Sequence, residues 1–431
     1  MNILIIGTGY VGATTAMVFA ESGWQVTGLD IDANKIERLR QGQLHFHEPG
    51  LEQLIDKHVR SGRLLFTTDQ ETAITGHDVI FICVGTPSRP DGNADLRYIQ
   101  QAAEDIGQWM NGYKLVVTKS TVPVGTQEQV TAWIQAAQRQ PHPFDAASNP
   151  EFLREGKAVE DALRPDRIII GADSPKATEQ LLMLYQSFHC PKILTTPRTA
   201  ELIKYASNAF LATKISYMNE LAKLCDESKV NVNEVARGMG LDPRIGPSFL
   251  QAGLGYGGSC FPKDVSELVM SAREQGVQLR ILEQVMEVNR SQYAYLLDKA
   301  RSRLGDFANK NIAILGLAFK PDTDDIREAP ALRMIYDLLL EQANVRLFDP
   351  IAALPAHSSF DTVKVCTSAE EAIQGADAVI LCTEWTAFGQ LDWEKLKGQL
   401  RQPNFFDGRN MMDARAMRGI GFYYQGIGND Y

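Results

Sequence analysis

Short apolar runs alternate with longer amphipathic segments along the first part of the chain. The runs NILII, WQVTGLD, DVIFICVGTP and KLVVTKSTVPVGT have the length and composition of buried parallel strands, and each leads into a polar or glycine-rich loop. Helical stretches such as ATTAMVFAESG lie between the runs. Strands that alternate with helices predict a doubly wound parallel sheet, in which ligands bind at the carboxyl ends of the strands.

The pattern changes near residue 199 and again near residue 311. Residues 199–237 contain neither Gly nor Pro, and their apolar positions recur at helical spacing, so we expect one long connecting helix there. NIAILGLAFK and VRLFDP then repeat the order of NILIIGTGYV and VTGLD. The sequence therefore predicts an α/β protein with two Rossmann-like doubly wound domains joined by a long central helix, with boundaries at residues 1–198, 199–300 and 301–431.

Composition limits the classes of protein to consider. The 431 residues are 44% apolar, which suits two or three domains with their own cores, and no apolar run is long enough for a membrane span. The N-terminus lacks the basic leader and cleavage site of a signal peptide, so we expect a cytoplasmic location without membrane attachment. The net charge of −10 argues against nucleic-acid binding.

The cysteines and histidines predict no metal site. Six cysteines are scattered without a CxxC pair, so neither a zinc ribbon nor a dithiol redox motif is indicated, and we expect the thiols to stay reduced. His45 and His47 form an H-x-H without further ligands, which favours a surface or packing role.

The first loop carries a dinucleotide fingerprint. Gly7, Gly9 and Gly12 form GxGxxG between a predicted strand and a predicted helix, and Asp30 ends the next strand. The glycines let a pyrophosphate approach the helix N-terminus, and an acid at position 30 accepts hydrogen bonds from a ribose while repelling a 2′-phosphate. This context predicts NAD rather than NADP. The alternative is a glycine-rich turn of another α/β protein.

A second glycine-rich stretch, LGYGGSCFPKD, places the thiol of Cys260 just before Lys263 and Asp264. The alternative is a buried structural cysteine. Lys204 and Asn208 lie four apart on the long helix and so project from one face. A thiolate beside NAD suggests attack on an aldehyde, hydride loss to give a thioester, and hydrolysis, with a lysine ammonium on the oxyanion.

The motifs GTGYVG, CVGTP, STVPVGT, NPEFLREGKAVED, GYGGSCFPKD and GLAFKPDTDDIREAPA resemble the UDP-glucose/GDP-mannose dehydrogenase family over nearly the whole chain. The resemblance implies oxidation of the primary alcohol at carbon 6 of a nucleotide sugar to a carboxylate, with two NAD reduced. Members that oxidise UDP-glucose match most closely. Dehydrogenation of GDP-mannose or of a UDP-N-acetylhexosamine stays open, as does a non-catalytic nucleotide-binding regulator on the same fold.

The resemblance also assigns residues. The implied catalytic set holds the nucleophile, the oxyanion contacts, a proton-transfer acid and the groups around the hydrolytic water: Cys260, Lys204, Asn208, Asp264, Glu151, Glu155 and Thr121. The implied NAD contacts are Gly7, Gly9, Tyr10, Val11, Gly12, Asp30, Lys35, Thr86, Thr121, Glu155, Lys263 and Arg327. The implied substrate contacts are Glu151, Phe152, Leu153, Lys204, Asn208, Arg244, Phe249, Gly253, Gly257, Cys260 and Lys320.

Two further expectations follow from the resemblance. The first domain would bind NAD, the second would connect and dimerise, and the third would bind the UDP-sugar. Arg244 matches an arginine that reaches the substrate of a neighbouring subunit, which implies a homodimer. Tyr256 stands where phenylalanine is common in the family, and this departure leaves the selectivity for the sugar open.

Overall fold

Two α/β units make up the chain, at Met1–Ser207 and Asn208–Tyr431. The computed structural model describes residues 1–356 and 358–429. Each unit contains a Rossmann-type sheet, and one long helix begins in the first unit and ends in the second, so the predicted fold class is confirmed. The predicted division into three domains at residues 198 and 300 stays a prediction.

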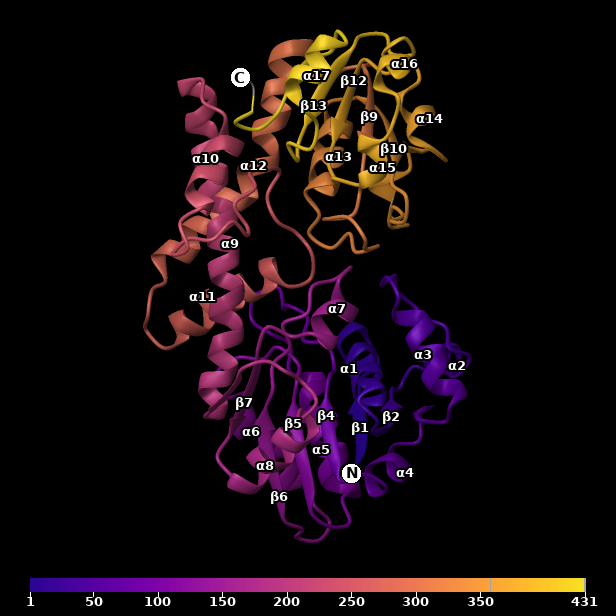
Figure 1. Cartoon of the computed structure of the whole chain (residues 1–431), viewed down its shortest axis with the longest axis vertical. Helices are drawn as coiled ribbons and strands as arrows, with labels where there is room; N and C mark the ends of the chain where they lie inside the picture. Colours follow the sequence, from indigo (N-terminus) through magenta and orange to yellow (C-terminus); the bar gives the residue numbers. More distant parts are fainter. Residues whose placement is uncertain (357, 430–431) are drawn as a thin grey trace. The chain divides into compact units, whose positions relative to one another are not determined.

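The first unit is built on an eight-stranded sheet in the order β3-β2-β1-β4-β5-β6-β7-β8 (Figure 1). Neighbouring strands are parallel except for β6 and β7, which pair antiparallel. The prediction of a fully parallel sheet is therefore wrong at this one pair of strands. The strands are β1 (Asn2–Ile6), β2 (Gln25–Leu29), β3 (Leu64–Thr67), β4 (Val79–Ile82), β5 (Lys114–Thr118), β6 (Phe144–Ser148), β7 (Ile168–Ala172) and β8 (Lys192–Thr195).

Helices connect these strands and cover the sheet. They are α1 (Tyr10–Glu21), α2 (Ala33–Arg40), α3 (Leu51–Arg60), α4 (Gln70–Thr75), α5 (Arg97–Trp109), α6 (Thr126–Ala137), α7 (Ala158–Leu163) and α8 (Pro175–Leu184). Several begin at a side chain that accepts a backbone N–H, as Asp32 does for α2 and Ser174 for α8. The segments that follow β1, β2, β4, β5 and β6 carry most of the predicted site residues of this unit, and Lys204 lies on the long helix at its end.

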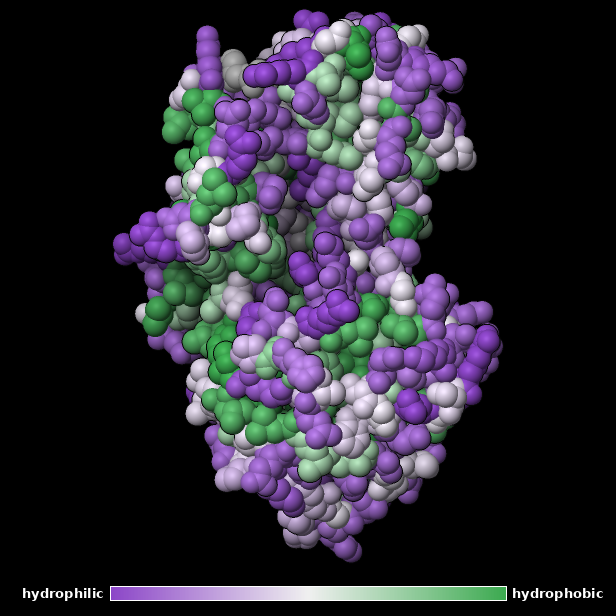
Figure 2. All heavy atoms as spheres, viewed as in Figure 1, coloured by the Kyte–Doolittle hydropathy of each residue, from purple (hydrophilic) through white to green (hydrophobic). Residues whose placement is uncertain are grey.

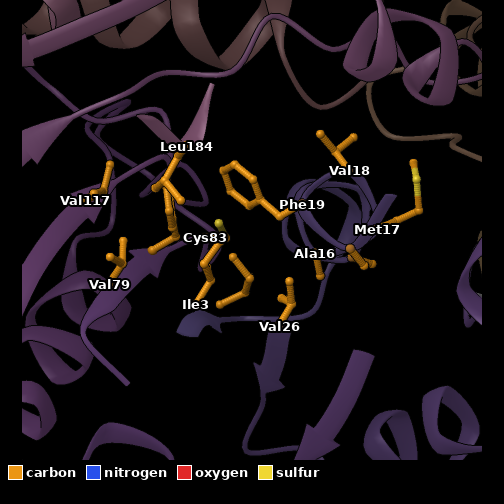
Figure 3. Packing of buried hydrophobic residues seen from close by; sticks show 14 of the residues in the cluster. Ile3, Ala16, Met17, Val18, Phe19, Val26, Val79, Cys83, Val117 and Leu184 are labelled. Atoms are coloured by element: carbon orange, nitrogen blue, oxygen red, sulfur yellow. The ribbon is translucent and has the colours of Figure 1, made fainter. Parts of the chain in front are cut away.

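Alternate residues of β1 enter two different cores, as the period of a strand requires. Ile3 and Ile5 pack on one face of the sheet with Phe19 of α1, and Leu4 and Ile6 pack on the other. Figure 3 shows the Phe19 ring reaching from its helix toward Ile3 and the neighbouring strand residues. The apolar run NILII is thus buried on both sides, which is why it reads as continuous rather than alternating.

Helix α9 (Pro197–Ser228) spans 32 residues, or about 48 Å, and includes Lys204 and Asn208 as predicted. Tyr205, Ala209 and Ala212 are buried along one side of it. Hydrophilic side chains cover much of the face drawn in Figure 2, with apolar patches among them. Within the described residues, no helix is apolar enough over a sufficient length to cross a membrane.

The second unit repeats the Rossmann order in a six-stranded parallel sheet, β11-β10-β9-β12-β13-β14. Ile312 and Ile314 of β9 face one core, and Ala313 and Leu315 face the other. The strands are β9 (Asn311–Leu315), β10 (Asn344–Phe348), β11 (Lys364–Val365), β12 (Ala378–Leu381), β13 (Asn404–Asp407) and β14 (Tyr423–Gln425). The echo of NILII in NIAIL therefore marks a second sheet with its own central strand.

Helices of the second unit fall into two groups (Figure 1). Those before the sheet are α10 (Val232–Gly240), α11 (Phe261–Glu274) and α12 (Arg280–Leu304). Those that come between its strands in the sequence are α13 (Pro330–Leu340), α14 (Ala369–Ile373), α15 (Thr386–Gly389), α16 (Trp393–Lys397) and α17 (Ala414–Gly419), with a short 3₁₀ turn, η1 (Ser358–Phe360).

Candidate active site

The turn between β1 and α1 has the geometry that a pyrophosphate site needs. Gly7 has a φ of +90°, and a Cβ on Gly12 would lie 1.8 Å from the Gly7 carbonyl oxygen, so the helix and the turn approach as closely as glycine allows. A Cβ on Gly9 would meet nothing within 4 Å. Val11 packs against the core beneath. The turn is thus tight on its inner side and open at Gly9, which fits an approaching dinucleotide.

Asp30 stands at the end of β2, beside this turn. Its carboxylate accepts the N–H and the hydroxyl of Thr8, at 2.9 and 3.0 Å, and lies 4.0 Å from the Lys35 ammonium. Burial opposes its ionisation, but these hydrogen bonds, a further one from Asp32 and the Lys35 charge outweigh burial and lower the pKa of Asp30. The side chains present therefore fit the adenosine ribose of NAD and offer a charge that would repel a 2′-phosphate.

A buried glutamate missed by the sequence analysis connects this turn to a distant loop. Glu48 accepts the Tyr10 hydroxyl at 2.5 Å and the amides of Gly156 and Ala158 at 2.6 and 2.7 Å. Burial and Glu48 raise the pKa of Tyr10, and the Glu155 carboxylate adds to this shift, which places Glu155 near the same hydroxyl. The one available signal for Glu48 was its place directly before Pro-Gly in the stretch HFHEPGL.

Thr86 and Thr121 come together although they follow different strands. The buried Thr86 hydroxyl donates to the Thr121 carbonyl at 2.8 Å. Ser120 donates in the same way to the carbonyl of Val84 at 2.6 Å. The loops after β4 and β5 are therefore joined by side-chain hydrogen bonds, and this holds Thr121 in a fixed position.

Glu151 and Lys204 form a buried ion pair, with 2.8 Å between Oε1 and Nζ. Their side chains are 6% and 3% exposed, so the pair is almost fully removed from water. The other oxygen of Glu151 accepts the Leu153 N–H, and the Lys204 ammonium lies 5.4 Å from the centre of the Phe152 ring. A buried pair of this kind is weak evidence for stability and better evidence for a functional site.

In the second unit, Cys260 is the residue that precedes the first turn of α11. The helix dipole at this end favours a thiolate. Lys263 contacts Asp264 at 2.6 Å and Glu267 at 3.6 Å. Burial opposes the charge on Lys263, but these carboxylates and the nearby Cys260 thiol outweigh burial and raise the pKa of Lys263. A cation and a helix N-terminus thus both act on this sulfur.

Asn208 and Asp264 also meet in this unit. The Asn208 amide donates to Asp264 Oδ2 at 2.6 Å, and both side chains are buried. Helix α9 therefore carries Lys204, paired with a glutamate, and one turn later Asn208, paired with an aspartate. Two pairs of predicted catalytic residues thus form on this helix, Lys204 with Glu151 and Asn208 with Asp264.

The glycine-rich loop before Cys260 is held by its own backbone. The Gly253 N–H donates to Asn219 and the Gly258 N–H to the Arg327 carbonyl. A Cβ on Gly257 would lie 2.5 Å from the Glu328 carbonyl oxygen, so glycine is required there for close packing. Phe249 adopts a φ of +64°, an uncommon conformation for a residue with a side chain.

Arg409 is a second residue that the sequence analysis did not identify. Its guanidinium donates to the carbonyls of Gly255, Phe319 and Cys382, at 3.1, 2.9 and 2.8 Å. It therefore fixes the glycine-rich loop to the turn after β9 and to the end of β12. The motif DGRN after a strand was visible in the sequence, but nothing local showed where the arginine would point.

Two of the predicted cationic contacts form local ion pairs at the surface, and a third lies beside an aromatic ring. Arg244 is 88% exposed and pairs with Asp242, and Arg327 is 66% exposed and pairs with Asp325. The Lys320 ammonium lies 5.2 Å from the centre of the Phe319 ring. Their predicted roles toward substrate, cofactor and a neighbouring subunit remain predictions.

Comparisons with known proteins agree with this arrangement. Three models of the UDP-glucose/GDP-mannose dehydrogenase family match: the NAD binding domain at residues 1–189, the central domain at 198–291 and the UDP binding domain at 313–414. The chain is 44% identical to UDP-glucose 6-dehydrogenase TuaD of Bacillus subtilis, over 99% of this chain and 93% of that protein. It is also 44% identical to the UDP-glucose 6-dehydrogenase of Pseudomonas aeruginosa, over 99% and 97%.

Solved structures give the same result. A UDP-glucose dehydrogenase from the archaeon Pyrobaculum islandicum matches with a TM-score of 0.92 and 39% identity, over 99% of this chain and 98% of that chain. A UDP-D-ManNAc dehydrogenase from Pyrococcus horikoshii matches with a TM-score of 0.89 and 31% identity, over all of both chains. With a fingerprint turn that fits NAD and relatives similar over their full length, the chain belongs to the UDP-glucose/GDP-mannose dehydrogenase family.

Proposed function

We propose that the protein is an NAD-dependent UDP-glucose 6-dehydrogenase that converts UDP-glucose to UDP-glucuronate. The observation that carries the proposal is the Cys260 thiol at the N-terminus of α11 with the Lys263 ammonium beside it. This setting activates a thiol as a nucleophile, which a simple alcohol dehydrogenase does not need. Full-length similarity to several UDP-glucose 6-dehydrogenases supports the choice of substrate.

The chemistry is a four-electron oxidation. When bound, NAD would supply the hydride acceptor, and two NAD molecules in turn would each take up one hydride. In the first step, the C6 alcohol loses a hydride and a proton and becomes an aldehyde. The Cys260 thiolate adds to the aldehyde carbon to form a thiohemiacetal, whose loss of a second hydride and a proton leaves a thioester. Water then cleaves the C–S bond, giving the carboxylate and releasing the thiol.

The chain's other groups manage charge and protons. In this proposal the Lys204 ammonium and the Asn208 amide stabilise the oxyanions at carbon 6, and Asp264 exchanges protons with Lys204 through water. Glu151, Glu155 and Thr121 hold and activate the hydrolytic water. Gly9, Asp30 and Lys35 hold the pyrophosphate and ribose of the cofactor.

Counting NADH tests the reaction. With limiting UDP-glucose and excess NAD, about two NADH per sugar are expected for a thioester route. A ratio of one would mean that oxidation stops at the aldehyde and would refute the mechanism. Cys260→Ser should stop turnover while calorimetry still detects binding of both UDP-glucose and NAD, and Cys225→Ser serves as the matched control at a buried thiol.

A second candidate substrate is a UDP-N-acetylhexosamine. The observation in its favour is the similarity to the UDP-D-ManNAc dehydrogenase of Pyrococcus horikoshii over the full length of both chains. Parallel measurements of kcat/KM with UDP-glucose, UDP-N-acetylmannosamine and GDP-mannose decide between the candidate substrates. UDP-glucose is expected to give the highest value, and a higher value for another sugar would replace it.

We also infer a cytoplasmic homodimer. Phe210, Tyr217 and Leu224 recur every seven residues on α9, and they are 65%, 49% and 60% exposed. This spacing places them on one face of the helix, where a second copy could cover them. Sedimentation should give twice the chain mass, and Leu224→Lys should give the single-chain mass. A wild-type protein that sediments as a single chain would refute the dimer.

A further inference from the structure

Lys119 interacts electrostatically with both members of the Glu151–Lys204 pair, and the mechanism above does not use it. It follows β5 directly, and its ammonium donates to Asn149, to Oδ1 at 3.1 Å and to the carbonyl oxygen at 3.4 Å. Asn149 in turn follows β6, and its N–H donates to the Thr118 carbonyl at 2.9 Å. Lys119 is thus anchored to the same loop that carries Glu151.

Asn149 is held in place by neutral groups. Its Oδ1 also accepts the Tyr185 hydroxyl at 2.5 Å, and its Nδ2 donates to the Ile169 carbonyl at 2.7 Å. The amide can therefore orient Lys119 but supplies no negative charge to it. A cation held by a neutral, fixed amide projects its field onto its neighbours instead of being neutralised at its own contact.

The charged neighbours of Lys119 lie on three other segments. Burial lowers the pKa of Lys119, and the Lys204 ammonium on α9 lowers it further. The Cys83 thiol after β4 and the Glu151 carboxylate oppose this shift and favour the charged form. The Tyr10 hydroxyl interacts with Glu151 from the side of α1. The Glu48 and Glu155 carboxylates act on the same hydroxyl, so the ion pair has acidic neighbours on the α1 side as well. Glu151 itself interacts with two lysines, Lys204 and Lys119.

We propose that Lys119 is a positioning residue that sets the ionisation of Lys204 through its field on the Glu151–Lys204 pair. This inference rests on the proposed function. Glu151 alone would hold the Lys204 ammonium firmly, whereas a second cation nearby opposes that effect and makes the Lys204 proton easier to release. A lysine that is to exchange a proton during alcohol oxidation requires such a balance. Since the groups are coupled, the pH profile reports the cluster as a whole.

Four variants separate charge from shape. Lys119→Met removes the charge with little change in length. Asn149→Asp keeps Lys119 in place but adds a negative charge beside it, so both variants lessen the positive field at Lys204. Lys119→Arg keeps the charge, and Tyr185→Phe removes one hydrogen bond to Asn149 without changing any charge.

The readout is the pH profile of kcat/KM for UDP-glucose, with binding of NAD and thermal unfolding measured beside it. The limb that reports loss of the Lys204 proton should move to higher pH by about one unit in Lys119→Met and in Asn149→Asp. Lys119→Arg and Tyr185→Phe should keep the wild-type profile even if their rates fall.

Two results would overturn the inference. One is a lower rate with an unchanged profile in both Lys119→Met and Asn149→Asp, because lost packing lowers the rate without moving the profile. The other is a Lys119→Arg profile displaced as far as that of Lys119→Met. Failure of the proposed function is distinct, since it appears as a wild-type protein that forms no NADH from UDP-glucose.

Discussion

Two alanine substitutions in one turn should have different effects on folding and the same effect on cofactor binding. At Gly12 an added Cβ would lie 1.8 Å from the Gly7 oxygen and 2.9 Å from the Gly7 carbonyl carbon, both backbone atoms that cannot rotate away. At Gly9 the same atom would meet nothing within 4 Å. Gly12→Ala must therefore move α1 away from the turn, whereas Gly9→Ala changes only the surface that faces the cofactor.

The magnitudes follow from these distances. Separating Gly12 from Gly7 to ordinary contact needs a shift of more than 1 Å, so we expect Gly12→Ala to lower the free energy of unfolding by about 1–3 kcal/mol. Gly9 has φ −70° and ψ −163°, which alanine adopts without strain. Alanine lowers the entropy of the unfolded chain, which stabilises the fold, but it caps a helix less well than glycine, which destabilises it. Because these effects oppose each other, Gly9→Ala should change the free energy of unfolding by less than about 1 kcal/mol.

Urea unfolding and NAD calorimetry on the two variants test this reasoning. Both should bind NAD at least about tenfold more weakly, or lose about 1.4 kcal/mol of binding free energy, because a methyl group at position 9 or a displaced helix disturbs the pyrophosphate site. If Gly12→Ala unfolds like the wild type, the close contact is wrong. If Gly9→Ala binds NAD normally, the fingerprint does not hold the pyrophosphate.

Three further predictions concern other buried or charged groups. Burial raises the pKa of Glu201 from 4.5 to about 7, against two backbone N–H groups at the start of α6 that lower it. The protonated Glu201 therefore stabilises the fold below pH 4.5, and this contribution is lost as the pH rises through about 7. Glu201→Gln should remove up to about 3 kcal/mol of this pH dependence, measured by urea unfolding at several pH values. An unchanged slope of the free energy of unfolding against pH would contradict it. Arg409→Met should lower the free energy of unfolding by about 2–4 kcal/mol and weaken UDP binding measured by calorimetry, because three loops lose a shared hydrogen-bond donor. Arg409→Lys should restore only part of the stability and of the affinity for UDP. Full restoration by lysine would argue that the planar guanidinium is not needed. Asp30→Asn should raise kcat/KM for NADP relative to NAD by about tenfold, since the hydrogen-bonding shape remains and the charge does not; an unaltered ratio would show that selectivity arises elsewhere.

The sequence predicts well those parts of the structure that depend on residues close together in the chain. The turn at Gly7–Gly12, the strand before it and Asp30 after it all lie within one βαβ unit, so spacing alone places them. Lys204 and Asn208 share a helix whose period fixes their relation. The same reasoning located the second sheet, because NIAIL repeats the short apolar run of NILII.

Other features depend on contacts that have no local pattern. The run IIIGA of β7 reads the same whether its strand is parallel or antiparallel, and β7 proved antiparallel to β6. Glu48 has its partners 38 to 110 residues away, and Arg409 binds backbone carbonyls, which any residue can supply. The role proposed for Lys119 had no signal in the sequence, because only the folded loops bring the charges near it.

The thiols of this protein differ enough in environment to allow an active-site titration. Burial raises the pKa of Cys83 and Cys382 to about 12 and also raises the pKa of Cys190, Cys225 and Cys366 above the ordinary value. Thiolates, rather than thiols, attack alkylating reagents, so these five react slowly at neutral pH, whereas the sixth lies partly exposed at a helix N-terminus. A brief exposure to excess iodoacetamide should therefore label one sulfur per chain. Counting that label would give the fraction of competent enzyme in a preparation, against which every turnover number can be normalised.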